Sequence, residues 1–185
     1  MTAAMVAEEP ATQIPAGEWE IDPVWSALEF EVRKLGLVAI KGRVLGFTGS
    51  IVGGDNATIS GTVDATTVTT FDETRDGHLQ APDFFDTQRY PELRFESTSV
   101  ENNGEGLVAR GDLTIKGVTK PIELRGSYSG SEQDPLGNER IGLELAGTVD
   151  RTDFGLEWNA PLPGGGFLLP NEVALKATFA AVRKS

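Results

Sequence analysis

Cysteine is absent from this chain of 185 residues, and neither long apolar runs nor clusters of basic residues occur. Without cysteine there can be no disulfide, no thiolate metal site and no cysteine nucleophile. No segment approaches the roughly 20 consecutive apolar residues that a membrane-spanning helix requires. The lack of disulfides leaves the cellular compartment undecided.

The chain carries an excess of negative charge. Lys and Arg number 16 against 28 Asp and Glu, which gives a formal net charge of -12. Such a surface repels a phosphate backbone unless a local basic stripe is present, and the sequence shows none. We therefore expect no nucleic-acid partner. An anionic membrane surface is disfavoured for the same reason, and we expect no stable membrane insertion.

The N-terminal segment lacks the features of a secretory signal. The first basic residue is Arg33, and Glu8, Glu9 and Pro10 interrupt the apolar residues before it. A signal peptide needs a positive start followed by an apolar stretch. We expect a cytoplasmic protein, exported only if a signal peptide has been removed. Residues 1–16 are expected to form a flexible lead-in, and residues 17–185 a single β-barrel domain.

Strict alternation of apolar and polar residues is the strongest signal in the chain. Leu143 and Leu145 project to one side of their segment, and Leu175 and Phe179 do the same near the C-terminus. A strand with one apolar face and one polar, solvent-facing side is typical of an antiparallel sheet that curls around an interior. Strands are predicted at about 17–34, 37–51, 58–69, 93–100, 105–116, 119–129, 140–150 and 173–183. The pattern predicts an all-β, antiparallel, eight-stranded barrel, which is just wide enough for side chains or one small ligand.

Small residues face the predicted interior. Gly126, Gly147 and Ala177 occupy inward positions of their strands. They either leave space inside the barrel or relieve crowding at its corners.

Two segments interrupt the strand pattern. Residues 70–73 have the form of a capping box and predict a short helix, which Gly77 weakens and Pro82 ends. The following segment, 83–86, places two phenylalanines between two aspartates as an apolar plug. Residues 158–171 are rich in Pro and Gly around Phe167, Leu168 and Leu169, and we expect them to fold over the barrel as a lid.

Candidate reactive groups are few. His78 is the only histidine and could act as a general base oriented by Asp76, or it could cap a helical turn. No ligand spacing that would fix a tetrahedral metal ion is present near it. Lys116, Lys120 and Arg125 could receive an anionic headgroup or form a solvated edge. We expect no catalytic residue, no metal and no cofactor.

Several motifs, in order from residue 17 onward, resemble the YceI-like family of lipid- or polyisoprenoid-binding proteins. They are Trp19-Glu20-Ile21-Asp22-Pro23 with Ser26 and Phe30, Arg75-Asp76-Gly77-His78-Leu79, Asp83-Phe84-Phe85-Asp86, Tyr90-Pro91-Glu92-Leu93-Arg94-Phe95-Glu96-Ser97-Thr98, Gly111-Asp112-Leu113-Thr114-Ile115-Lys116-Gly117-Val118-Thr119-Lys120 and Arg151-Thr152-Asp153-Phe154-Gly155. The resemblance implies a lipocalin-like barrel with a short helical segment covering one side. It also implies an apolar tunnel that holds an isoprenoid or another long-chain amphiphile.

Two positions depart from the family pattern. Trp25 and Lys34 stand where the family commonly has histidine. The loss of both imidazoles removes a histidine-dependent headgroup contact or metal site, and Trp25 is expected to narrow the tunnel.

The sequence thus predicts a non-enzymatic protein that binds, sequesters or transports one long-chain lipid in its barrel. The predicted lining residues are Leu28, Phe30, Val32, Phe47, Phe84, Phe85, Phe95, Leu113, Ile115, Leu143, Phe154, Phe167, Leu168 and Phe179. Two alternatives stay open: a structural or stress-related dimeric interaction module with a filled core, and a lipid-modifying enzyme that uses His78 and Asp76. An edge strand or the loop from Trp158 could support a homodimer.

Overall fold

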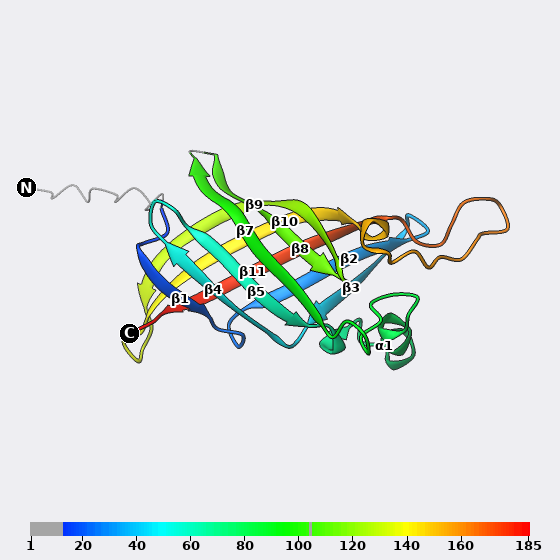
Figure 1. The fold of residues 1–185 in the computed structure, drawn as a ribbon, viewed down its shortest axis with the longest axis horizontal. Coiled ribbons are helices and arrows are strands. Elements are labelled where there is room, and N and C mark those ends of the chain that lie inside the picture. The colour runs from blue at the N-terminus through cyan, green and yellow to red at the C-terminus, as the bar shows by residue number, and fades with distance from the viewer. Residues whose placement is uncertain (1–12, 104) are drawn as a thin grey trace, which may run out of the picture.

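The computed structural model describes residues 13–103 and 105–185, which form a closed antiparallel barrel (Figure 1). Its strands are β1 (Gly17–Ile21), β2 (Ala27–Lys34), β3 (Val38–Val44), β4 (Phe47–Gly53), β5 (Thr58–Asp64), β6 (Val68–Thr69), β7 (Glu92–Asn103), β8 (Gly106–Ile115), β9 (Val118–Gln133), β10 (Glu139–Asp150) and β11 (Glu172–Arg183).

These segments build eight strand positions around the barrel, because two long strands are each broken into two. β1 and β2 lie end to end along β11, with Trp19 opposite Arg183 and Leu28 opposite Ala177. In the same way, β3 pairs with β2 and β4 pairs with β1. The short strand β6 pairs only with the end of β3. The other strands follow in chain order, and β1 against β11 closes the ring. The predicted eight-stranded barrel is confirmed.

The break between β1 and β2 has a local cause. Pro23 lacks the N–H that a ladder position needs, and the chain leaves the sheet there. Ser26 restores the lost pairing, since its hydroxyl accepts from the Ala180 amide at 3.0 Å and donates to the Ala180 carbonyl at 3.3 Å. A side chain thus takes the place of a backbone ladder at the kink.

The α-helix α1 (Glu73–Gln80) lies beside β6 at one end of the barrel (Figure 1). The predicted cap at Thr70 is wrong, because Asp72 is the N-cap and accepts from the Arg75 amide at 2.9 Å. Phe71, with φ of 63°, turns the chain so that Asp72 reaches that position. As predicted, the helix ends just before Pro82, with Ala81 as its C-cap.

Apolar side chains inside the barrel form two clusters. One lies around Trp19, Ile51 and Leu143, where the ends of the chain approach. The other joins Phe84 and Phe154 with Ile115 and Leu156, next to α1. The space between the two clusters is the site described below.

Residues 1–12 of the predicted lead-in lie outside the described residues. The residues that follow contact the barrel: Ile14 is buried, and its carbonyl accepts from the Gly54 amide at 2.9 Å. Among the described residues, no helix has the length and apolar composition needed to cross a membrane.

Candidate functional site: an apolar cavity in the barrel

A cavity of about 260 Å³ occupies the barrel between the two apolar clusters. Its wall is almost entirely apolar and is built from the inward faces of the strands, from Leu79 of α1 and from Phe84 and Phe85. An enclosed apolar cavity of about 150 Å³ already takes up benzene. The size and lining of this cavity therefore suit an apolar guest, and the barrel core is not filled by its own side chains.

Eleven of the fourteen predicted lining residues do border the cavity. They are Leu28, Phe30, Val32, Phe47, Phe84, Phe85, Phe95, Leu113, Ile115, Phe154 and Phe179. The structure thus brings together residues from β2 to β11. That they bind a ligand stays a prediction.

The other three predicted lining residues lie elsewhere. Leu143 faces inward but is packed in the cluster around Trp19 and does not border the cavity. Phe167 is 64% exposed, and it borders an outer groove together with Leu168. Phe167 and Leu168 therefore do not close over the cavity as expected, because hydrogen bonds hold this part of the loop outward, as described below.

Many smaller lining residues were missed by the sequence interpretation. They include Ile21, Val44, Ile59, Val63, Val68, Leu93, Ile122, Leu124, Leu145, Val149, Leu156, Val173, Leu175 and Ala177. The signal was present, since alternation places Leu175 and Ala177 on the same face as Phe179. The predicted lining contains mainly the largest side chain of each inward face, so the other inward residues are absent from it.

Gly126 and Gly147 do not leave space for a ligand, and only Ala177 of the three small inward residues borders the cavity. A Cβ on Gly126 would lie 1.7 Å from the Glu144 carbonyl oxygen, and one on Gly147 would lie 2.7 Å from the Glu123 carbonyl oxygen. These glycines therefore allow β9 and β10 to approach closely.

The segment after α1 closes one side of the cavity. Pro82 interrupts the helix, and the Phe84 and Phe85 amides donate to the Ala81 and Leu79 carbonyls at 2.9 and 3.0 Å. This tight turn directs both rings to the cavity. Lys116, the residue after β8, stabilises this turn because its ammonium group donates to the Pro82 carbonyl at 2.6 Å. Lys116 thus supports the cavity wall.

His78 and Asp76 are not paired with each other. His78 Nε2 lies 3.1 Å from an Asp83 carboxylate oxygen, and its ring packs edge-on against Phe84 and Trp158. Burial opposes ionisation of Asp76, but hydrogen bonds from Thr69 and Thr70 outweigh it and lower the pKa of Asp76.

The contacts of Asp76 and His78 serve to hold α1 and the segment after it in place. Asp76 ties α1 to the strand that precedes it, and His78 sits in an aromatic cluster. The described residues contain no group of three His, Cys, Asp or Glu side chains placed to hold a metal ion.

Arg151, at the end of β10, borders the cavity and is buried. Burial lowers the pKa of its guanidinium, although Asp150 opposes that shift. Nη1 donates to the Leu156 and Trp158 carbonyls at 2.6 and 2.9 Å, and Nε donates to the Pro170 carbonyl at 2.9 Å. One side chain therefore fixes both ends of the loop 158–171.

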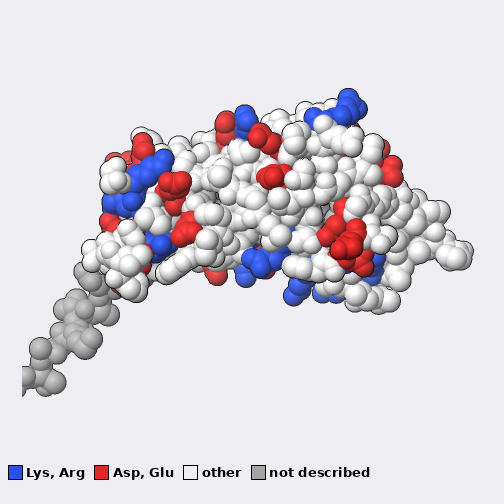
Figure 2. All heavy atoms as spheres, turned by 90° about the horizontal axis from the view of Figure 1, so that it is seen from below, with Lys and Arg blue, Asp and Glu red and all other residues white. Residues whose placement is uncertain are grey.

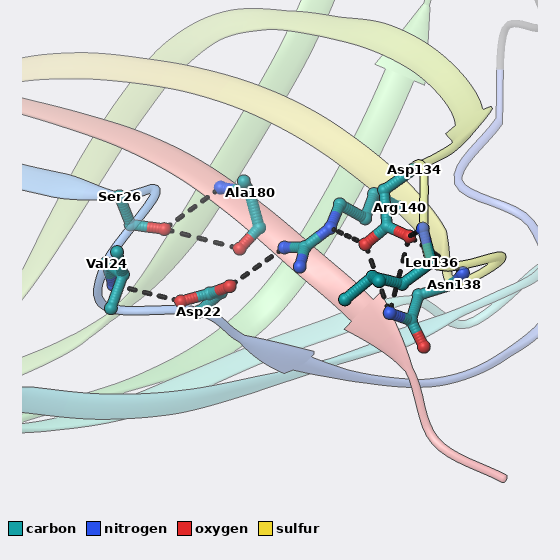
Figure 3. A network of polar contacts seen from close by, with 8 residues as sticks. All are labelled: Asp22, Val24, Ser26, Asp134, Leu136, Asn138, Arg140 and Ala180. Carbon is teal, nitrogen blue, oxygen red and sulfur yellow. Dashed lines mark hydrogen bonds and ion pairs between the residues drawn. The ribbon is translucent and has the colours of Figure 1, made fainter.

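Arg140 holds the opposite end of the barrel together (Figure 3). Its guanidinium donates to Asp22 at 2.8 Å and to Asp134 at 2.7 Å. The hydrogen bond from Arg140 is the main cause that lowers the pKa of each carboxyl group, and it acts against burial. Asp134 also caps its own turn, accepting from the Leu136 and Asn138 amides. The network joins the β1–β2 kink to the β9–β10 turn.

Trp25 does not narrow the tunnel. Its side chain is 57% exposed, and the Arg140 guanidinium lies 4.1 Å from the centre of its ring, outside the cavity. Lys34 ends β2 and does not border the cavity either. Both departures from the family pattern therefore fall outside the cavity wall.

A family model and individual proteins match this chain. Residues 19–181 match the YceI-like domain. The UPF0312 protein of Photorhabdus laumondii is 36% identical over 129 residues, which cover 68% of this chain and 67% of that protein. The UPF0312 protein of Staphylococcus aureus is 32% identical over 162 residues, 85% of this chain and 92% of that protein. Protein YceI of Escherichia coli O157:H7 is 42% identical over 96 residues, so the match spans 50% of that protein and 52% of this chain.

Solved structures share the fold. A YceI protein of Campylobacter jejuni superposes with a TM-score of 0.67 at 26% identity, covering 80% of this chain and 88% of that one. BcnA of Burkholderia cenocepacia gives 0.71 at 17% identity, covering 86% and 98%. A polyisoprenoid binding domain of Saccharophagus degradans gives 0.66 at 17% identity, covering 90% and 98%. At 17% identity the likeness shows the fold alone.

Proposed function

The chain belongs to the family of YceI-like domains, and on that basis we propose that its barrel binds one long-chain amphiphile without chemically changing it. The cavity of about 260 Å³, lined by apolar side chains around the barrel, is the observation that carries the proposal. The polyisoprenoid binding domain of Saccharophagus degradans, which has the same fold, supports an isoprenoid or a related lipid as the ligand.

The energetics of burial agree with such a ligand. Removing a methylene group from water contributes about 0.8 kcal/mol, so roughly ten methylenes contribute about 8 kcal/mol. This lies within the range of about 4–15 kcal/mol that association costs in lost translational and rotational freedom. A long chain can therefore bind through its length, with little need for a polar anchor. Sequestration or transport of the lipid is part of the proposal.

The proposal is tested by extracting the protein, purified without detergent, with organic solvent and analysing the extract by mass spectrometry. We expect a long-chain lipid in amounts comparable to the protein. An empty protein that also fails to take up a polyene fatty acid, followed by fluorescence, would refute the proposal.

A variant that fills the cavity sharpens this test. Leu175 faces the cavity from β11, and Leu175→Trp adds a large ring to that space. We expect lipid recovery to fall about tenfold or more, because the ring competes for the volume. Ala146→Trp is the control, since Ala146 lies opposite Lys176 on the outer face and is exposed. Equal lipid recovery from both variants would place the ligand outside the barrel.

A further inference from the structure

The end of the molecule beyond the cavity exposes a group of apolar side chains. Leu35, Leu37 and Val38 lie at the β2–β3 turn, and Phe167 lies in the loop 158–171; we call these four residues the apolar tip. Leu37 is 75% exposed, and the other three are at least half exposed. The two loops touch, because the Leu35 amide donates to the Leu168 carbonyl at 3.0 Å.

Both loops hold these side chains outward by defined contacts. In the loop 158–171, the Leu168 amide donates to the Ala160 carbonyl at 2.9 Å, and Asn159 exchanges two hydrogen bonds with the Leu169 backbone. Arg151 anchors the base of this loop, as described above. Leu35 has a φ of 56°, a conformation that costs free energy for a bulky residue. The exposure of the apolar tip is therefore built into the fold.

The apolar tip adjoins the cavity. Val32, three residues before Leu35, and Val173, two residues after Asn171, both border the cavity. Leu169 packs against the cluster of Phe84 and Phe154 that forms one side of the cavity wall. A guest leaving between these elements would pass close to the apolar tip.

Charge at this end differs from that of the whole chain. Residues 158–171 and 35–40 contain no Asp, Glu, Lys or Arg. Figure 2 shows the projecting end of the molecule free of charged side chains, in contrast to the rest of that face. Lys34 and Lys41 flank the β2–β3 turn, and neither forms an ion pair within the described part of the chain, whereas Glu157 and Glu172 flank the loop 158–171. Charged side chains of both signs therefore begin only at the base of the two loops, outside the apolar tip.

We propose that the apolar tip docks on the surface of a phospholipid bilayer, so that the cavity exchanges its amphiphile with the membrane. The proposal rests on the proposed function. An uncharged, apolar end fits the interfacial layer of a bilayer, where exposed apolar side chains lose contact with water. The excess negative charge on the remaining surface keeps the contact peripheral and reversible.

Sedimentation of the full chain with phosphatidylcholine vesicles tests this docking. We expect the protein to bind the vesicles, and Leu37→Ser and Phe167→Ser each to weaken the partitioning about tenfold. Both side chains are exposed, so the variants are expected to fold. Leu136→Ser is the matched control, because Leu136 is 87% exposed in the β9–β10 turn, near the C-terminal end of β11. The control is expected to bind as the unmodified chain does.

Other outcomes are informative. Absence of vesicle binding, or an equal loss in the Leu136→Ser control, would overturn the docking proposal. A dimeric mass in solution that Leu37→Ser reduces to a monomer would show that a second copy covers the tip, which also overturns it. Uptake of the polyene fatty acid is expected to stay unchanged in both tip variants. If the unmodified protein takes up no polyene fatty acid, the proposed function is contradicted, whatever the result with vesicles.

Discussion

Arg140 shows how one side chain can hold together distant parts of a barrel. It contacts Asp22 at the β1–β2 kink, Asp134 in the β9–β10 turn and the ring of Trp25. Its side chain is only 16% exposed, so these contacts are partly shielded from water. Ion pairs in such a setting contribute more than fully exposed ones. The Arg140 guanidinium therefore supports the kink together with the Ser26 hydroxyl.

This network predicts a pH-dependent effect of Arg140→Met. The folded-state pKa values of Asp22 and Asp134 are lowered, so their contribution to stability is present above the unfolded value of about 3.9 and is lost as pH falls. We expect the variant to melt a few degrees lower at neutral pH. The difference should shrink as pH falls below about 4, where these carboxyls bind protons in the unfolded chain before they do so in the folded protein. Thermal unfolding followed by circular dichroism across this range measures it.

Arg94→Met serves as the control for that experiment. Arg94 forms an exposed pair with Glu92 at 3.6 Å, and such pairs contribute little. The account is contradicted if both variants lose the same stability, or if the effect of Arg140→Met is unchanged in acid.

Individual residues also show the limits of sequence reasoning. Alternation correctly directed Phe30 and Phe179 to the cavity, because strand geometry fixes which face a side chain occupies. It also directed Leu143 inward, but the depth of a residue along the barrel is not encoded in a period of two. The environment of Trp25 depends on Arg140, more than a hundred residues away, and no local pattern contains it.

At the scale of elements, the strands were predicted more accurately than the connections. Strands occur in all eight predicted regions, since turn residues such as those at 134–138 mark their ends. The strand predicted at 58–69 is too long, because a 3-10 turn at Ala65–Thr67 ends β5 at Asp64 and brings β6 against β3. The start of α1 was misplaced, because Phe71 adopts a left-handed conformation that the capping-box pattern does not anticipate. The loop 158–171 was expected to close over the barrel, but its hydrogen bonds hold Phe167 outward.

The segment after α1 supports a prediction about stability. Phe84 is 7% exposed and packs on Trp158 with ring centres 5.7 Å apart, so Phe84→Ala is expected to cost about 3 kcal/mol or more in the free energy of unfolding. Phe71→Ala, at a phenylalanine that is 72% exposed, should change it by no more than about 0.5 kcal/mol. Urea denaturation measures both, and similar losses would mean that the Phe84 segment does not anchor this end of the barrel.

At the scale of the whole molecule, the proposed function depends on the space between two apolar clusters. The residues around Trp19 fill one end of the barrel, and those around Phe84 and Phe154 cover the other side, with the cavity between them. Alternation predicted the barrel, but it could not show whether inward side chains meet in the middle. That depends on strand number, tilt and stagger together, which are properties of the closed sheet.

The most direct test of the central claim is a crystal structure of the protein purified without detergent. We predict elongated electron density inside the barrel, in contact with Phe30, Leu175 and Phe85. An interior in which these side chains pack against one another, with no passage between them, would contradict the account.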